Sequence, residues 1–133
     1  MTANLNTRRH GEIVIIDVAD RLDPGRCATG LREKISELAQ FGNRWILFDM
    51  FGVTGLDANA ARDLVLAGAS IAMLGGDVKL MNVCRSLQES LTSARLDRLL
   101  ETFGDERAAI QSLEMAQAAR LRAASRRSEL YWG

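Results

Sequence analysis

A run of branched apolar residues near the N-terminus limits the folds open to this chain more than any other feature. In the segment Glu12 to Val18, the four consecutive residues from Ile13 to Ile16 are all apolar and β-branched. A strand exposed on one side alternates apolar and polar residues, whereas a strand buried on both faces has a continuous apolar run. The sequence therefore predicts a strand covered on both sides, and His10-Gly11 can turn the chain from a short first strand near Asn4 to Arg9.

The rest of the chain alternates between strand and helix patterns. The expected elements are a helix around residues 31–38, a strand at 45–49, a helix at 60–72, a strand at 78–83, a short helix at 87–91, a weak strand at 99–103 and a helix from Asp105. Gly42 and Gly75-Gly76 are placed to end the first two helices. This order predicts an α/β fold with a mixed sheet of about 4–5 strands flanked by about 4 helices.

Length and charge indicate one domain with a basic end. A chain of 133 residues has the size of a single domain. Seventeen basic and seventeen acidic residues give no net charge, which argues against general attraction to nucleic acid or anionic membrane. Residues 116–133 carry four arginines and one glutamate, a charge of +3 that leaves −3 on the remainder. We expect a domain over residues 1–115 and a helical extension with a basic tail over 116–133, fraying from about Ala124.

Cysteine and histidine are too few for a zinc site. Cys27 and Cys84 form no C-x-x-C pair, and His10 is the single histidine. We interpret both cysteines as buried, reduced thiols and expect no metal. Met1 to Asn6 lack the apolar core of a signal peptide, and no stretch approaches the ~18 apolar residues of a membrane span. The sequence therefore predicts a cytoplasmic protein.

Catalytic and cofactor-binding patterns are weak. Gly52 to Gly55 have neither the spacing of a phosphate-binding loop nor its lysine. His10 lies in a predicted turn without a nucleophile placed beside it by the sequence, so we interpret it as solvated. We expect a protein that is not an enzyme and binds no cofactor.

One enzymatic alternative stays open, a carboxylate that accepts a phosphoryl group with the help of magnesium. Four aspartates lie near the ends of predicted strands: Asp17, Asp20, Asp23 and Asp49. The lysine that such chemistry needs should follow a late strand, whereas Lys79 lies inside one. Loop residues and helix caps are the simpler explanation of these carboxylates.

The segment from Trp45 to Leu74 carries the most functional information. A strand leads into a glycine-containing loop, and Asp57 is placed as the N-cap of the helix that follows. That helix is rich in alanine and glycine, and small side chains allow close packing against the sheet. They equally allow a partner to lie close to the start of the helix.

Over about Asn4 to Leu113 the chain resembles the STAS domain of bacterial anti-sigma-factor antagonists. The resemblance rests on the buried first long strand with Arg21-Leu22-Asp23 after it, the strand from Trp45 to Asp49, Gly52-Val53 with Leu56-Asp57, and the segment from Gly75 to Asn82. The family signature at the helix start is Asp-Ser-Ser/Ala-Gly-Leu. Asp57 matches its aspartate, while the phosphorylated serine falls on Ala58 and the next three positions on Asn59, Ala60 and Ala61.

The resemblance implies a non-enzymatic module that regulates transcription by binding a protein partner, an anti-sigma factor or a related histidine-kinase-like ATPase. In regulated relatives the unphosphorylated form binds, and a phosphoserine, with about −1.5 to −2 charges, blocks docking. Because Ala58 cannot take that charge, binding would be constitutive at this position. The implied docking surface comprises Asp23, Pro24, Asp57, Ala58, Asn59 and Arg62.

The alternative is a non-switchable scaffold subunit of a STAS assembly or of a membrane transport complex. The sequence leaves self-association open, and it gives no support to a nucleic-acid partner.

Overall fold

The computed structural model describes the backbone of residues 5–18, 27–51, 53, 58–93, 95 and 97–132, and the side chains of residues 6–18, 33–51, 53, 61–93, 95 and 97–125. The elements, in chain order, are β1 (Leu5–His10), β2 (Ile13–Val18), α1 (Cys27–Gln40), β3 (Trp45–Asp49), α2 (Ala58–Met73), β4 (Asp77–Met81), α3 (Arg85–Ser93), β5 (Thr102–Phe103) and α4 (Glu106–Trp132). The predicted order of strands and helices is confirmed.

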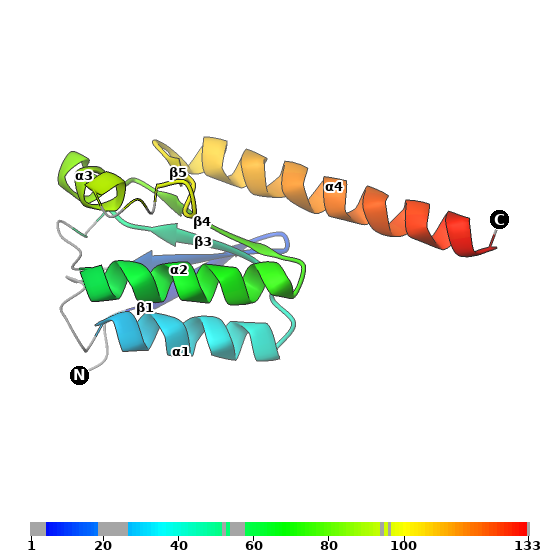
Figure 1. The fold of residues 1–133 in the computed structure, drawn as a ribbon, viewed down its shortest axis with the longest axis horizontal. Coiled ribbons are helices and arrows are strands. Elements are labelled where there is room, and N and C mark those ends of the chain that lie inside the picture. Colours follow the sequence, from blue (N-terminus) through cyan, green and yellow to red (C-terminus); the bar gives the residue numbers. More distant parts are fainter. Residues whose placement is uncertain are drawn as a thin grey trace.

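The strands form one five-stranded mixed sheet in the order β1-β2-β3-β4-β5. β1 pairs antiparallel with β2 through the turn at Gly11, and the other neighbours are parallel. α1 and α2 lie side by side along one face, and α4 crosses the other (Figure 1). The predicted α/β fold, with about five strands and four helices, is confirmed.

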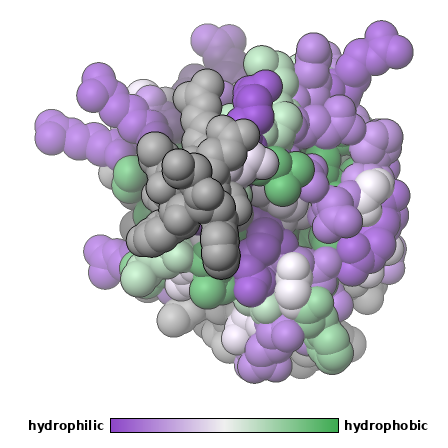
Figure 2. Space-filling model, turned by 90° about the vertical axis from the view of Figure 1, so that its right-hand side faces the viewer, coloured by the Kyte–Doolittle hydropathy of each residue, from purple (hydrophilic) through white to green (hydrophobic). Residues whose placement is uncertain are grey.

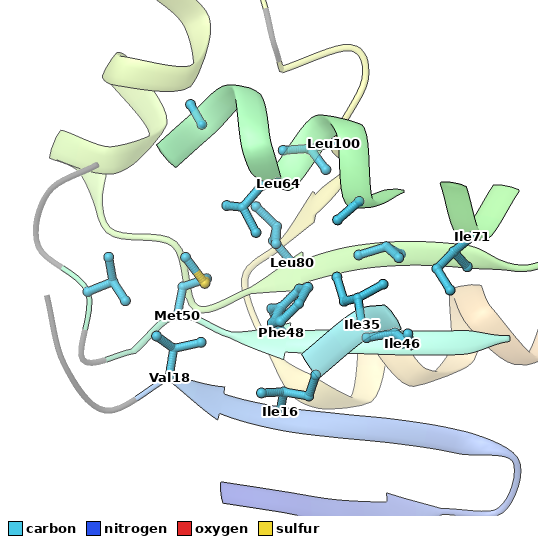
Figure 3. Close-up of a cluster of buried hydrophobic side chains, with 14 of the residues drawn as sticks. Ile16, Val18, Ile35, Ile46, Phe48, Met50, Leu64, Ile71, Leu80 and Leu100 are labelled. Atoms are coloured by element: carbon cyan, nitrogen blue, oxygen red, sulfur yellow. The ribbon is translucent and has the colours of Figure 1, made fainter. Parts of the chain in front are cut away.

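β2 is buried on both faces, as its sequence predicts. Val14 and Ile16 pack in the cluster beneath α1 and α2, where Phe48 and Leu64 also lie (Figure 3). Ile13 and Ile15 point the other way, into a second cluster with Ala109 and Leu113 of α4. Burying each such side chain contributes about 1.5–3 kcal/mol. A polar residue in place of any of these four would therefore weaken the packing of the sheet against the helices on one of its faces.

The small residues of α2 bring this helix close to the sheet. Ala61 and Ala67 are buried. A Cβ on Gly68 would stand 3.7 Å from Leu100 and 3.8 Å from Val78, which is ordinary van der Waals contact. Of the small residues of α2, Ala61 and Ala67 thus lie in the core, whereas Ala69, Ser70 and Ala72 are exposed.

Four expectations about boundaries and burial are wrong. β5 comprises Thr102 and Phe103 rather than residues 99–103. β4 ends at Met81 rather than near Val83, because Asn82 turns into the left-handed region with φ of 57°. Cys84 is half-buried rather than buried, and the side chain of Cys27 lies outside the described residues. α4 continues as a helix to Trp132, past Ala124, where the sequence predicts fraying.

α4 extends beyond the rest of the fold. Its C-terminal part runs past the ends of α1 and α2, and the side chains from Ala118 to Ser125 are exposed (Figure 1). Viewed from that end, hydrophobic and hydrophilic residues are interspersed on the described surface (Figure 2). No helix among the described residues is both long and apolar enough to cross a membrane. The predicted division of the chain after residue 115 stays a prediction.

We expect Gly76→Ala to destabilise the protein strongly. A Cβ on Gly76 would stand 1.8 Å from the carbonyl oxygen of Arg44, whose position is fixed because that oxygen accepts a hydrogen bond from Asp77 N at 2.9 Å. Backbone atoms would have to move, so the free energy of unfolding should fall by about 3 kcal/mol or more. Urea unfolding measures the loss. Gly104→Ala is the matched control, because a Cβ there meets nothing within 4 Å. Equal losses in the two variants would contradict the packing described at Gly76.

Candidate functional site

The site expected from the sequence lies at one edge of the sheet. β2 and β3 are parallel neighbours, with Asp17 and Asp49 as partners at their carboxyl ends. The chain therefore leaves both strands at the same edge. The start of α1, which follows β2, and the start of α2, which follows β3, lie at the same end of the molecule (Figure 1).

The described part of the expected docking surface is the beginning of α2. Ala58 and Asn59 are the first two residues of this helix, and Arg62, one turn further, is exposed. The inward positions Ala61 and Leu64 are buried, so Arg62 projects from the opposite side. The other three expected residues, Asp23, Pro24 and Asp57, lie outside the described residues. Their joint role in docking stays a prediction.

Hydrogen bonds fix the chain where it leaves β3 towards α2. Asp49 Oδ1 accepts hydrogen bonds from the Phe51 N–H at 3.1 Å and from Asn82 Nδ2 at 3.0 Å. The Val53 N–H donates to the carbonyl of Met50 at 2.9 Å, and Met50 and Val53 are fully buried. The start of the loop is therefore held rigidly to the sheet.

This geometry leaves Phe51 in solvent, with 82% of its surface exposed, between two buried residues of the same turn. An aromatic side chain that is exposed on a fixed backbone is well suited to protein contacts. Phe51 is not among the site residues expected from the sequence. Its signal is an aromatic residue two positions after the aspartate that ends a strand.

An arginine of the edge strand holds the carboxylates on the α4 side of the sheet. Arg8 Nε donates to Asp17 Oδ2 at 3.4 Å, and Arg8 Nη2 lies 3.9 Å from Asp49 Oδ2 and also pairs with Glu106 at the start of α4. The hydrogen bond with Glu106, supported by Asp17, raises the pKa of the Arg8 guanidinium above its ordinary value. The two aspartates thus share a cation that the protein itself supplies.

The phosphoacceptor alternative finds no supporting arrangement in the described part of the chain. Asp17 and Asp49 contact Arg8, while Asp20 and Asp23 lie outside the described residues. Lys79 is buried on β4, where it pairs with Asp77 at 3.4 Å and with Glu101. Within the same described residues no group of three His, Cys, Asp or Glu side chains could hold a metal ion.

Comparison with known families gives one match, and it covers most of the fold. The model of the STAS domain family matches residues 4–109. The chain belongs to the STAS domain family. Comparison of the sequence with curated proteins finds no significant match.

Several solved structures share the STAS fold. A proposed anti-sigma factor antagonist from Thermotoga maritima has a TM-score of 0.73 at 17% identity, covering 83% of this chain and 94% of its own. The anti-sigma factor antagonist SpoIIAA in its unphosphorylated form has a TM-score of 0.69 at 17% identity, covering 83% and 96%. The murine anion transporter Slc26a9 has a TM-score of 0.65 at 17% identity, and the match covers 80% of this chain but 18% of the transporter. At these identities the likeness concerns the fold.

We expect Asp49→Ala to lower the free energy of unfolding by about 1–3 kcal/mol, because the Phe51 N–H and the Asn82 amide both lose their acceptor. Asp49→Asn is the matched control, since its amide oxygen can accept the same two hydrogen bonds and should retain most of the stability. Denaturant unfolding of the two variants makes the comparison. If both lose the same free energy, these hydrogen bonds do not hold the loop.

Proposed function

We propose that this STAS domain is a non-enzymatic regulatory module that binds a protein partner through the start of α2, as an anti-sigma-factor antagonist does. The observation that carries the proposal is the position of Ala58. It is the first residue of α2, at the edge where β2 and β3 end, in a chain of the STAS family. In the signature of the STAS family, the phosphorylated serine occupies the position of Ala58.

An alanine here makes binding independent of phosphorylation at this position. A phosphoserine would place about −1.5 to −2 charges beside Asp57 at a packed interface, where both charges would have to lose water. Alanine keeps the helix start small and uncharged. We therefore infer that the domain stays permanently in the binding-competent state.

The proposed surface combines the two chain segments that leave β2 and β3. It comprises Asp23, Pro24, Asp57, Ala58, Asn59 and Arg62, and Phe51, exposed on the turn that follows β3, is a further candidate at the same edge of the sheet. Small residues, an arginine and an exposed aromatic residue at one edge suit a protein surface. We propose an anti-sigma factor or related histidine-kinase-like ATPase as the partner, in the cytoplasm of a bacterium.

We expect Ala58→Glu to weaken binding to the cognate histidine-kinase-like anti-sigma factor more than tenfold, which corresponds to about 1.4 kcal/mol. The fold should persist, because an acidic side chain at a helix N-terminus is favoured by the helix dipole. Titration calorimetry measures the affinity. The control is Ala69→Glu, the same substitution at an exposed position three turns further along α2. Binding that survives Ala58→Glu in a folded protein would place the docking surface elsewhere.

A STAS-directed serine kinase should phosphorylate the variant Ala58→Ser but not the wild type. Incubated with a STAS-directed serine kinase and ATP, the wild-type chain should remain unmodified within residues 54–70, whereas Ala58→Ser should gain one phosphate. Intact-mass and peptide mass spectrometry detect the addition of one phosphoryl group. Stoichiometric modification of wild-type Thr54 or Ser70 would overturn the proposal that binding is not switched at the helix start.

A further inference from the structure

We propose that two copies of this chain pair in antiparallel orientation through the outer face of α4, with the two-fold axis at Ala118. α4 contacts the sheet through Ala109 and Leu113, which are buried. With 3.6 residues per turn, the opposite side of the helix is a separate stripe. All of its members between residues 107 and 125 are exposed: Arg107, Gln111, Glu114, Ala118, Arg122 and Ser125.

The residues on this side of α4 are arranged symmetrically about Ala118. Met115 and Leu121, three positions before and after it, are the exposed large apolar residues among the described side chains of α4, at 66% and 64% exposure. Glu114 and Arg122 stand four positions before and after it and carry opposite charges.

A two-fold axis through Ala118 converts this symmetry into complementary contacts. It brings each residue before Ala118 to the level of the residue equally far after it on the second copy. Glu114 then lies near Arg122 of the second copy, and Met115 lies level with its Leu121. Each of these contacts occurs twice in the dimer. A parallel pairing would instead set Glu114 against Glu114, so the charges favour the antiparallel arrangement.

Stabilisation of an isolated α4 by its own charges does not explain why Glu114 and Arg122 lie where they do. Residues 106–117 carry two glutamates and one arginine, while residues 118–132 carry four arginines and one glutamate. This gradient complements the dipole of the helix, but that interaction is confined to the first and last turns. Glu114 and Arg122 lie in the middle of a 27-residue helix. Within its own chain Glu114 contacts the edge of the sheet, where His10 Nε2 lies 3.3 Å from its Oε1. A second copy gives Glu114 an arginine partner in addition and gives Arg122 a glutamate partner.

The shape of the molecule accommodates this pairing. The stripe faces away from the sheet, so the two domains lie on the outer sides of the helix pair. Beside the first half of α4 is a shallow depression of about 590 Å³, lined by His10, Glu106, Arg107, Ile110, Gln111 and Glu114. The projecting second half of the other α4, about 22 Å long at 1.5 Å per residue, would lie over this depression. The start of α2 lies at the end of the molecule away from the projecting part of α4 and remains free (Figure 1).

Sedimentation equilibrium of the full chain tests the proposal with a pair of neighbouring alanines. We expect a dimer with a dissociation constant on the order of 1–100 μM. Ala118→Arg should weaken it at least tenfold, because a residue on the two-fold axis meets its own copy. Ala119→Arg, also exposed but turned 100° around the helix, should change it less than about twofold. A wild type that is monomeric at about 200 μM, or equal effects of the two variants, would overturn the proposal.

A charge exchange tests the orientation of the two helices. Glu114→Arg and Arg122→Glu should each weaken the dimer at least tenfold, since each creates a like-charge pair twice. The double variant should regain affinity to within about threefold of the wild type, because the opposite charges are restored with their positions exchanged. If the double variant is no tighter than the single variants, the helices are not paired in this orientation. Thermal unfolding by circular dichroism verifies that every variant is folded.

Discussion

The parallel pairing of β2, β3 and β4 is the constraint on which the rest of the structure depends. Parallel strands need long connections, and here α1 and α2 supply them and cover one face of the sheet. α4 covers the other face, so β2 and β3 lie between two apolar layers. The same pairing places the carboxyl ends of the strands at one edge. The segments that lead into α1 and α2 therefore start together, and the candidate docking site follows from the topology.

Charged side chains connect the edge strand β1 to its neighbouring strands and to α4. Arg8 of β1 contacts Asp17 of β2, Asp49 of β3 and Glu106 of α4, and His10 Nε2 lies 3.3 Å from Glu114 Oε1. These pairs are partly exposed, so each contributes modestly to stability. Together with the packing of Ala109 and Leu113 against the sheet, they set the direction in which α4 crosses it. That direction determines which side of α4 faces solvent and where its C-terminal half projects.

Much of the fold could be predicted because it depends on local patterns. The continuous apolar run of β2 indicated burial on both faces, and the glycines after α1 and α2 marked where those helices end. The end of β4 was missed because Val83 fits the apolar pattern, whereas the left-handed backbone of Asn82 depends on its tertiary setting. The sequence predicted the helical extension but not its continuation past Ala124. Residues 124–132 have no continuous apolar stripe that would indicate a helix there.

The residues of the candidate site could be predicted only in part. The family signature drew attention to Ala58, since the residues that carry it are adjacent in sequence. The group around Arg8 combines residues from β1, β2, β3 and α4, and only the register of the strands brings them together. The exposure of Phe51 depends on two hydrogen bonds to Asp49, one of which comes from Asn82 beyond β4. Such contacts have no signature in a single stretch of sequence.

We propose that a protein partner docks on the start of α2, whereas the outer face of α4 serves a separate contact. Amide chemical-shift mapping tests both proposals residue by residue, with the ¹⁵N-labelled chain titrated with the anti-sigma factor that we propose as its partner. The largest shifts should fall on residues 58–62 and on the turn at Phe51, with little change along residues 107–125. Large shifts confined to residues 107–125, with the start of α2 unaffected, would contradict both proposals.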